Sequence, residues 1–140
     1  MKIKVKKLSD HIPDLHYAKP GDAGFDLYTR EHAAIAPGAK AVLPTGISLE
    51  IPEGYVGLIW DKSGLSSKYG LKTFGGVIDS GYRGEIHVVM TNLSDNEHVF
   101  EVGDRVAQVL IQKFEAVTFE MVDELSESER GHAGFGSSGR

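Results

Sequence analysis

The sequence predicts an all-β fold of short strands joined by tight turns, in the manner of a β-sandwich, jelly roll or barrel. Apolar residues recur at every second position in several short stretches, which is the spacing of half-buried strands. Helical periodicity is scarce, and turn-forming residues separate the stretches at short intervals. The alternating stretches are Ile3 and Val5, then Ile47, Leu49 and Ile51, then residues 106–111.

Turns are expected where Pro, Gly, Asn and Asp cluster, because these residues adopt the backbone angles that reverse a chain. One short helix of a turn or two is expected at residues 63–68. Residues 75–86 place a turn between two apolar runs, which predicts a β-hairpin. The turn clusters are Pro20-Gly21-Asp22, Pro37-Gly38, Pro52-Glu53-Gly54, Asp79-Ser80-Gly81, Ser94-Asp95-Asn96 and Gly103-Asp104.

The 140 residues fit one domain over residues 1–125, followed by a tail over residues 126–140. The tail consists of Gly, Ser and charged residues around a single large apolar residue, Phe135, which is too little to anchor a packed segment. We expect the tail to be mobile without ligand. A frayed terminus is the plain alternative. An aromatic between glycines, flanked by Arg130 and Arg140, is instead suited to folding over a ring and a phosphate.

The amino-acid composition excludes several kinds of site and partner. Cysteine is absent, which excludes disulfides and thiolate metal sites, and the net charge is −5 without a basic stripe for polymeric DNA or RNA. A small polyanion would therefore need a few local cations or a metal ion. Without an apolar leader or a membrane-spanning run, a cytoplasmic setting is expected. The histidines lack the paired spacing of a zinc site and are interpreted as surface or structural: His11, His16, His32, His87, His98 and His132.

Asp79 and Tyr82 lie on the expected turn within GGVIDSGYRGEI, and they are the first candidates for chemistry. The adjacent glycines let the backbone approach a planar base closely, and Asp79 could hold a water molecule and act as a general base. The alternatives are a turn carboxylate that caps nearby backbone and a packed strand aromatic.

Ser63 and Gly64 could open the short helix so that its free N–H groups face a phosphate, with Lys62 supplying charge. The alternative is a plain N-capped helical turn. The segment is not a P-loop, because Lys68 is followed by Tyr69 where Ser or Thr is required.

Asp26 lies between Phe25 and Leu27 on an expected strand, where a carboxylate needs a partner if its face is buried. The partner could be a Mg²⁺-bound water or neighbouring backbone; otherwise the side chain faces the surface. Gln108 lies inside an apolar strand, and such a glutamine is either solvent-facing or functional.

In this order, the segments resemble the five motifs of the trimeric dUTP pyrophosphatase family. The resemblance implies a distorted β jelly roll, a homotrimer whose three active sites each draw residues from all three subunits, and a flexible C-terminal tail. It also implies Mg²⁺-dependent hydrolysis of dUTP to dUMP and pyrophosphate, which limits uracil in DNA and supplies dUMP for dTMP synthesis. The motifs are AGFDLYT (23–29), KSGLSSKYGL (62–71), GGVIDSGYRGEI (75–86), GDRVAQVLIQ (103–112) and RGHAGFGSSG (130–139).

The resemblance also implies a role for each matching position. Asp79 would orient and deprotonate the attacking water, Tyr82 would lie under the deoxyribose and exclude a 2′-hydroxyl, and Asp26 would support the water shell of Mg²⁺. Backbone at residues 73–78 would bind uracil, and Phe135 would close over it. The implied uracil-binding positions are Thr73, Phe74, Gly76 and Ile78, and the implied phosphate-binding or neighbouring positions are Lys62, Ser63, Gly64, Gln108, Arg130, Gly136, Ser137 and Ser138.

Three positions depart from the family pattern. Lys62 stands where the family usually has Arg, which keeps the charge but loses the planar fork that binds phosphate through two bonds. Ala133 stands where Gly is usual and restricts positive φ, and Ser138 stands where Thr is common.

Two other functions remain open. The dCTP deaminases resemble this family in fold and share two of the motifs, but their catalytic Glu would fall at Val89 here. A non-catalytic binding module on the same fold is the third possibility, since fold alone does not certify activity. The joint presence of Asp79, Tyr82 and Phe135 argues against it.

Overall fold

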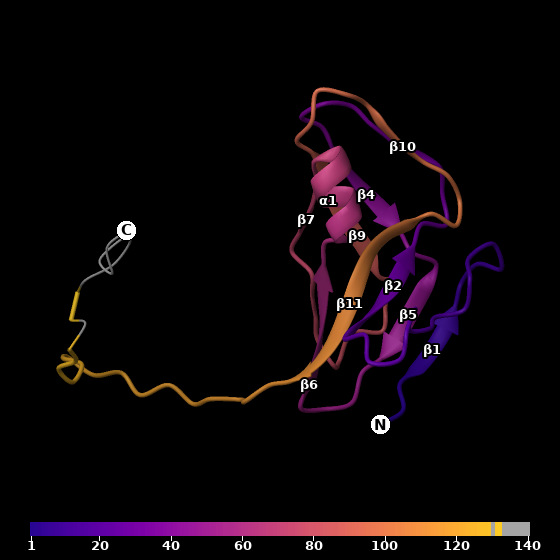
Figure 1. The fold of residues 1–140 in the computed structure, drawn as a ribbon. Coiled ribbons are helices and arrows are strands. Elements are labelled where there is room, and N and C mark those ends of the chain that lie inside the picture. Colours follow the sequence, from indigo (N-terminus) through magenta and orange to yellow (C-terminus); the bar gives the residue numbers. More distant parts are fainter. Residues whose placement is uncertain (130, 133–140) are drawn as a thin grey trace.

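The protein is built from short antiparallel strands and one short helix (Figure 1). The computed structural model describes residues 1–129 and 131–132. The elements in chain order are β1 (Lys4–Lys7), β2 (Gly24–Tyr28), β3 (Ala33–Ile35), β4 (Lys40–Pro44), β5 (Ile47–Glu50), β6 (Tyr55–Trp60), α1 (Ser63–Tyr69), β7 (Leu71–Phe74), β8 (Val77–Ile78), β9 (His87–Asn92), β10 (His98–Phe100) and β11 (Arg105–Lys113). The all-β prediction is confirmed, and so are the expected strands and the short helix.

The strands form small antiparallel sheets, of which two matter most for the site. One has the order β2-β11-β6-β8, and the other has the order β4-β9-β7. The pairs β1-β5 and β10-β3 complete the sheets of the described residues. Many short strands distributed over small sheets are typical of a jelly-roll-like body.

Strand β11 is the centre of the larger sheet, because it pairs with β2 on one side and β6 on the other. Its register shifts between Arg105 and Ala107, so two successive side chains, Val106 and Ala107, are both buried. Regular alternation then resumes with Val109 in the core. Leu27 of β2 packs in the same fully buried cluster. This cluster positions the polar residues of β2 and β11 on the opposite face.

The turn predictions are also confirmed. Gly21, Gly38, Gly54 and Gly103 all have positive φ, which a residue with a side chain adopts at a cost. Helix α1 ends at Gly70, whose left-handed conformation returns the chain into β7. Among the described residues, no helix is long and apolar enough to cross a membrane.

The hairpin expected at residues 75–86 is wrong, although its turn exists. Strand β8 pairs with β6, whereas β9 pairs with β4 and β7, so the two strands on either side of the turn belong to different sheets. After the turn, Ile86 donates its N–H to Ile47 O at 2.9 Å and accepts at its carbonyl from Thr45 N at 3.1 Å. These bonds place the chain beside the β4–β5 connection. From there it continues into β9 of the β4-β9-β7 sheet and does not pair with β8.

The chain leaves the folded body after β11 (Figure 1). Residues 114–129, called the arm below, are exposed throughout and contain no helix or strand. Phe119, Met121 and Leu125 are 88%, 93% and 88% exposed. Strand β11, the last strand among the described residues, thus ends at Lys113, whereas the domain boundary at residue 125 and the tail assignment stay predictions.

Candidate active site

Asp26 is the centre of a buried ionic cluster. It lies in β2 with only 9% of its surface exposed, and each of its carboxylate oxygens has a cationic partner. Lys62 Nζ donates to Oδ1, and Arg105 Nε lies 2.9 Å from Oδ2. The expectation of a partner is correct and the surface-facing alternative is wrong. The partners are basic side chains, so the cluster carries a net positive charge beside the strand.

Gln108 stands beside this cluster because of the strand register. It lies opposite Asp26 on β2 and opposite Trp60 on β6. Its side-chain N–H donates to Asp61 O at 3.0 Å, so the side-chain amide has a defined hydrogen-bond partner in the protein. A Cβ on Gly24 would lie 2.8 Å from Gln108 Oε1, so a side chain at residue 24 would displace the Gln108 amide. Asp26, Lys62 and Gln108 line a hollow of about 320 Å³.

Helix α1 begins directly after Lys62. Lys62 occupies the N-cap position and provides no side-chain cap, so the alternative of a conventional N-capped turn is wrong. The first N–H groups of a helix have no acceptor within the helix. Ser63 and Gly64 are both exposed there. Lys62, Gly64 and Arg105 also line an adjoining hollow of about 220 Å³, so the first turn borders the cationic cluster.

Asp61 is a structural member of the site that the sequence did not reveal. Its Oδ1 accepts from Thr73 N at 2.7 Å and Thr73 Oγ1 at 2.6 Å, and its Oδ2 accepts from Lys72 Nζ at 2.7 Å. Burial raises the pKa of Asp61, but the hydrogen bonds from Lys72 and Thr73 outweigh it and bring the pKa below its ordinary value of 3.8. Asp61 therefore ties the end of β6 to β7. No spacing rule pairs Asp61 with Thr73, because helix α1 brings them together.

Asp79 and Tyr82 line a second hollow, of about 250 Å³, together with Ile59, Gly76 and Ile78. Tyr82 N donates to Asp79 O at 3.1 Å and closes the turn. The Asp79 side chain is exposed and makes no hydrogen bond to another described residue, so it does not cap the turn. Tyr82 is 46% exposed and is not a packed core aromatic.

Gly76 brings backbone close to this second hollow. Its φ is 98°, and a Cβ at this position would lie 2.9 Å from Ile59 O. Ile59 N donates to Gly76 O at 2.8 Å. Phe74, two residues before Gly76, is half exposed. Thr73 donates both its N–H and its hydroxyl to Asp61 and so has neither group available for a ligand. The backbone after Phe74 is thus the part of residues 73–78 that is arranged at the hollow.

A single chain does not bring the two hollows together. Ile78, next to Asp79, pairs with Gly57 of β6, whereas Gln108 pairs with Trp60 of β6 from the opposite side. Three residues along a strand and two strand spacings across give a separation of about 14 Å between Ile78 and Gln108. Asp79 and the cationic cluster therefore lie at separate places on one chain.

The remaining predicted site residues lie in the tail. Arg130, Ala133, Phe135, Gly136, Ser137 and Ser138 lie outside the described residues. Over residues 1–129 and 131–132, no three His, Cys, Asp or Glu side chains gather into a metal-binding group.

The chain resembles proteins of known activity over nearly its full length. A family model described as dUTPase matches residues 10–139. A deoxyuridine 5'-triphosphate nucleotidohydrolase from Streptomyces coelicolor is 44% identical over 142 residues, which cover 99% of this chain and 78% of that protein. The protein of the same name from Corynebacterium glutamicum is 43% identical and covers 99% of this chain and 95% of that protein.

Solved structures show the same similarity. The dUTPase of Staphylococcus bacteriophage 80alpha with dUPNHPP has a TM-score of 0.90 and 34% sequence identity, with 99% of each chain covered. A mutant dUTPase from phage phi11 of S. aureus, described for the coordination of a structural Mg(II) ion, has a TM-score of 0.82 and 29% identity. The match covers 89% of this chain and 98% of that one.

The Asp61 contacts predict a pH-dependent difference between the wild type and Asp61→Asn. The lowered pKa means that the charged carboxylate stabilises the fold fully above its ordinary pKa of 3.8, and that this contribution is lost as pH falls through the folded pKa. At pH 6, Asp61→Asn should lower the free energy of unfolding by about 1–2 kcal/mol. The difference should shrink below pH 3.8, as measured by urea denaturation at fixed protein concentration. A constant difference across this range would show that the charge contributes nothing.

Proposed function

Because this chain belongs to the dUTPase family, we propose that it hydrolyses dUTP to dUMP and pyrophosphate by attack of water at the α-phosphorus. The observation that supports this most directly is the state of Asp79. It is an exposed carboxylate without a side-chain hydrogen bond among the described residues, held on a closed turn beside a hollow with approachable backbone. The other carboxylates of the site, Asp26 and Asp61, are occupied by protein partners.

Asp79 acts as the general base. Its free oxygens accept a hydrogen bond from one water molecule and take its proton as the oxygen attacks phosphorus. The bond from the α-phosphorus to the bridging oxygen breaks, and pyrophosphate leaves with that oxygen. Phosphoryl transfer of this kind requires mainly positioning and neutralisation of charge, with little covalent work by the protein.

Residues 74–78 recognise the base, and Tyr82 recognises the sugar. Glycine at position 76 lets this backbone lie close against Ile59 of β6, and the N–H and C=O groups of residues 74–78 then bind the uracil edge and leave no room for a 5-methyl group. The Tyr82 ring lies on the same hollow and packs under the deoxyribose, where it leaves no space for a 2′-hydroxyl. Ile59 and Ile78 supply the apolar wall.

The cationic cluster binds the phosphates. The first N–H groups of α1, with Ser63 and Gly64, and the Gln108 amide bind phosphate oxygens. Lys62 contributes a point charge where a guanidinium is usual in the family. Arg105 shares Asp26 with Lys62 and lines the same hollow, so it supplies a guanidinium close by. This arrangement compensates for lysine at position 62.

The surroundings of Asp26 fit a Mg²⁺ ion that contacts the carboxylate through a bound water and not by direct coordination. Its Oδ1 accepts a hydrogen bond from Lys62 and its Oδ2 forms an ion pair with Arg105, so a metal ion would meet this carboxylate through its water shell. Mg²⁺ typically keeps several waters and binds largely through substrate phosphates, whose negative charge it neutralises. Asp26 would then orient that water shell, while Lys62 and Arg105 would remain in place.

The active site is shared between subunits of a homotrimer. Within one chain, Ile78, the neighbour of Asp79, is separated from Gln108 by about 14 Å through the register of β6, so we assign the phosphate-binding residues next to Asp79 to another subunit. The arm supports assembly independently, because Phe119 and Met121 are almost fully exposed on a single chain. The tail of a further subunit, with Phe135, closes over uracil, and Arg130, Ser137 and Ser138 meet the terminal phosphate.

Deamination of dCTP is the second candidate, and the described site argues against it. The strand after the turn begins at His87 and continues through Val88 and Val89, so the position that would hold the deaminase's Glu is apolar. Glu85, the nearest carboxylate, is fully engaged by Arg30 and Gly46. Ammonia release from dCTP would identify a deaminase directly.

Asp79→Asn should lower kcat for dUTP by about 10²–10⁴-fold while dUTP still binds, because only the proton acceptor is lost. Pyrophosphate release measured with dUTP, UTP, dTTP and dCTP tests the wild type, which should prefer dUTP. Asp95→Asn, on an exposed loop, is the matched control and should retain wild-type turnover. Full turnover in Asp79→Asn would refute the assigned role.

Mixed oligomers test the shared site. Asp79→Asn and Gln108→Glu should each be inactive, the second because a negative charge faces the phosphates. When the two are unfolded and refolded together, sites that combine an intact Asp79 and an intact Gln108 should return about a quarter of wild-type activity. Sedimentation equilibrium should give a mass three times 15.2 kDa. A monomer, or no recovery in the mixture, would contradict the model.

Truncation after Leu125 tests the tail. The shortened chain keeps every element of the body, so the trimer should persist with an unchanged sedimentation mass. Turnover of dUTP should fall at least tenfold, because closure over the nucleotide excludes water and completes the phosphate contacts. A fully active truncated enzyme would show that the tail is only a terminus.

A further inference from the structure

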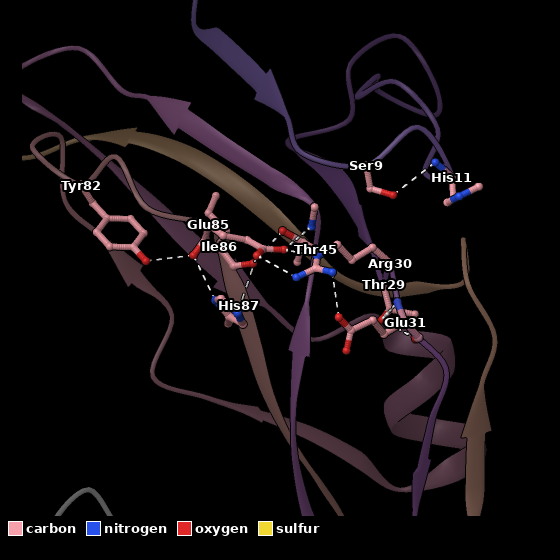
Figure 2. Close-up of polar contacts among 11 residues, drawn as sticks. Ser9, His11, Thr29, Arg30, Glu31, Thr45, Tyr82, Glu85, Ile86 and His87 are labelled. Carbon is pink, nitrogen blue, oxygen red and sulfur yellow. Dashed lines mark hydrogen bonds and ion pairs between the residues drawn. The ribbon is translucent and has the colours of Figure 1, made fainter.

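Glu85 lies three residues after Tyr82 and is bound by groups from two other parts of the chain (Figure 2). Its Oε1 accepts from Arg30 Nε at 2.7 Å and from Gly46 N at 2.8 Å, and its Oε2 accepts from Arg30 Nη2 at 3.2 Å. The side chain is 16% exposed. Glu85 therefore makes a two-bond contact with one arginine and a third bond to backbone, which fixes its position and its direction.

The backbone of Glu85 holds the site residue Tyr82. The Tyr82 hydroxyl donates to Glu85 O at 2.8 Å (Figure 2). A Cβ at Gly84 would lie 2.5 Å from that hydroxyl, so the end of the ring lies directly over Gly84. The position of the Tyr82 ring thus depends on where the carbonyl of residue 85 points. The turn that carries Asp79 is in turn closed by Tyr82 N.

The groups that hold Glu85 belong to a rigid part of the body. Arg30 follows β2 and donates its N–H to Pro44 O at 2.9 Å, at the end of β4. Gly46 lies in the connection from β4 to β5, with φ of 69°, a conformation that turns its N–H toward the carboxylate. Ile86, the next residue after Glu85, is hydrogen-bonded to Thr45 of the same connection and to Ile47 at the start of β5. These hydrogen bonds therefore fix the chain at the two residues just after the turn.

We propose that the Arg30–Glu85 ion pair is a positioning element that holds the Tyr82 ring, and with it the Asp79 turn, against the sugar of the bound nucleotide. The proposal rests on the proposed function for what the turn recognises, and on the contacts above for how the turn is held. It assigns to Glu85 and Arg30 an indirect role in selecting deoxyribose over ribose. Neither residue touches the substrate.

The chemistry of the pair fits positioning better than general stabilisation. The planar guanidinium makes two bonds of defined direction, which a lysine could not reproduce. The Arg30 hydrogen bond is the main reason that the pKa of Glu85 lies below its ordinary value of 4.5, so the carboxylate is charged wherever the protein is folded near neutral pH. Loss of either partner would leave the other charge partly buried and free to shift the backbone of residue 85.

Arg30 also supplies a matched control. Its Nη1 donates to Glu31 Oε1 at 2.7 Å, and this second pair is largely exposed and lies away from the turn. Glu31→Gln removes an ion pair of the same arginine without touching Glu85. The informative variants are Glu85→Gln, which keeps size and shape, and Arg30→Met, which keeps most of the aliphatic stem. Arg30→Lys restores the charge with a single point of contact.

The decisive measurement is kcat/KM for dUTP and for UTP in each variant. Glu85→Gln and Arg30→Met should each lower kcat/KM for dUTP by about tenfold to a hundredfold, since small displacements of a positioned group have such effects. They should also lower the dUTP-to-UTP ratio by about tenfold, and the double variant should be no worse than either single one. Arg30→Lys should give kcat/KM values between those of the wild type and Arg30→Met, and Glu31→Gln should give the wild-type values.

Loss of stability alone would reduce the turnover of both nucleotides equally, so an unchanged dUTP-to-UTP ratio in Glu85→Gln would overturn the proposal. Hydrogen exchange of the ligand-free protein separates this result from failure of the proposed function. The amide of Tyr82, which donates to Asp79 O, should exchange at least tenfold faster in Glu85→Gln, while those of β11 stay unchanged. Equal protection in wild type and variant would also overturn the proposal, whether or not dUTP is the substrate.

Discussion

The central constraint of this structure is the double pairing of strand β11, which fixes the register of β2 and β6 at once. Asp26, Gln108 and Trp60 lie side by side only because of that register. A shift of one residue in either pair would turn the polar residue toward the core and the apolar residues toward the hollow. The fully buried cluster of Leu27, Val106 and Val109 makes such a shift costly. The core thereby determines where the polar residues of the site can lie.

Three carboxylates connect the parts of the site, and each is paired with protein cations or hydrogen-bond donors. Asp26 joins β2 to the start of α1 and to β11, Asp61 joins β6 to β7, and Glu85 joins the turn to the β4–β5 connection. Asp79 differs from all three, since it has no such partner among the described residues. The three paired carboxylates hold the architecture, and under the proposed function Asp79 is the carboxylate that takes part in the chemistry.

The sequence predicted the fold class well because strand spacing and turn residues are local signals, as the alternation around Ile47 and the positive φ of Gly38 and Gly54 show. It also identified Asp26, Gln108 and Asp79 as residues in need of an explanation. It failed where contacts join distant positions. Nothing local shows that Asp61 binds Thr73 across a helix, or that Arg30 meets Glu85. The hairpin prediction failed for the same reason, because Thr45 and Ile47 capture the chain at Ile86.

The arm has a consequence for the order of folding and assembly. Strand β11, the last strand among the described residues, ends at Lys113, and the large apolar side chains of the arm, Phe119, Met121 and Leu125, all lie beyond it and outside the core. A chain therefore needs none of these side chains to complete its own core. If subunits assemble as proposed, they can meet as bodies that have already folded.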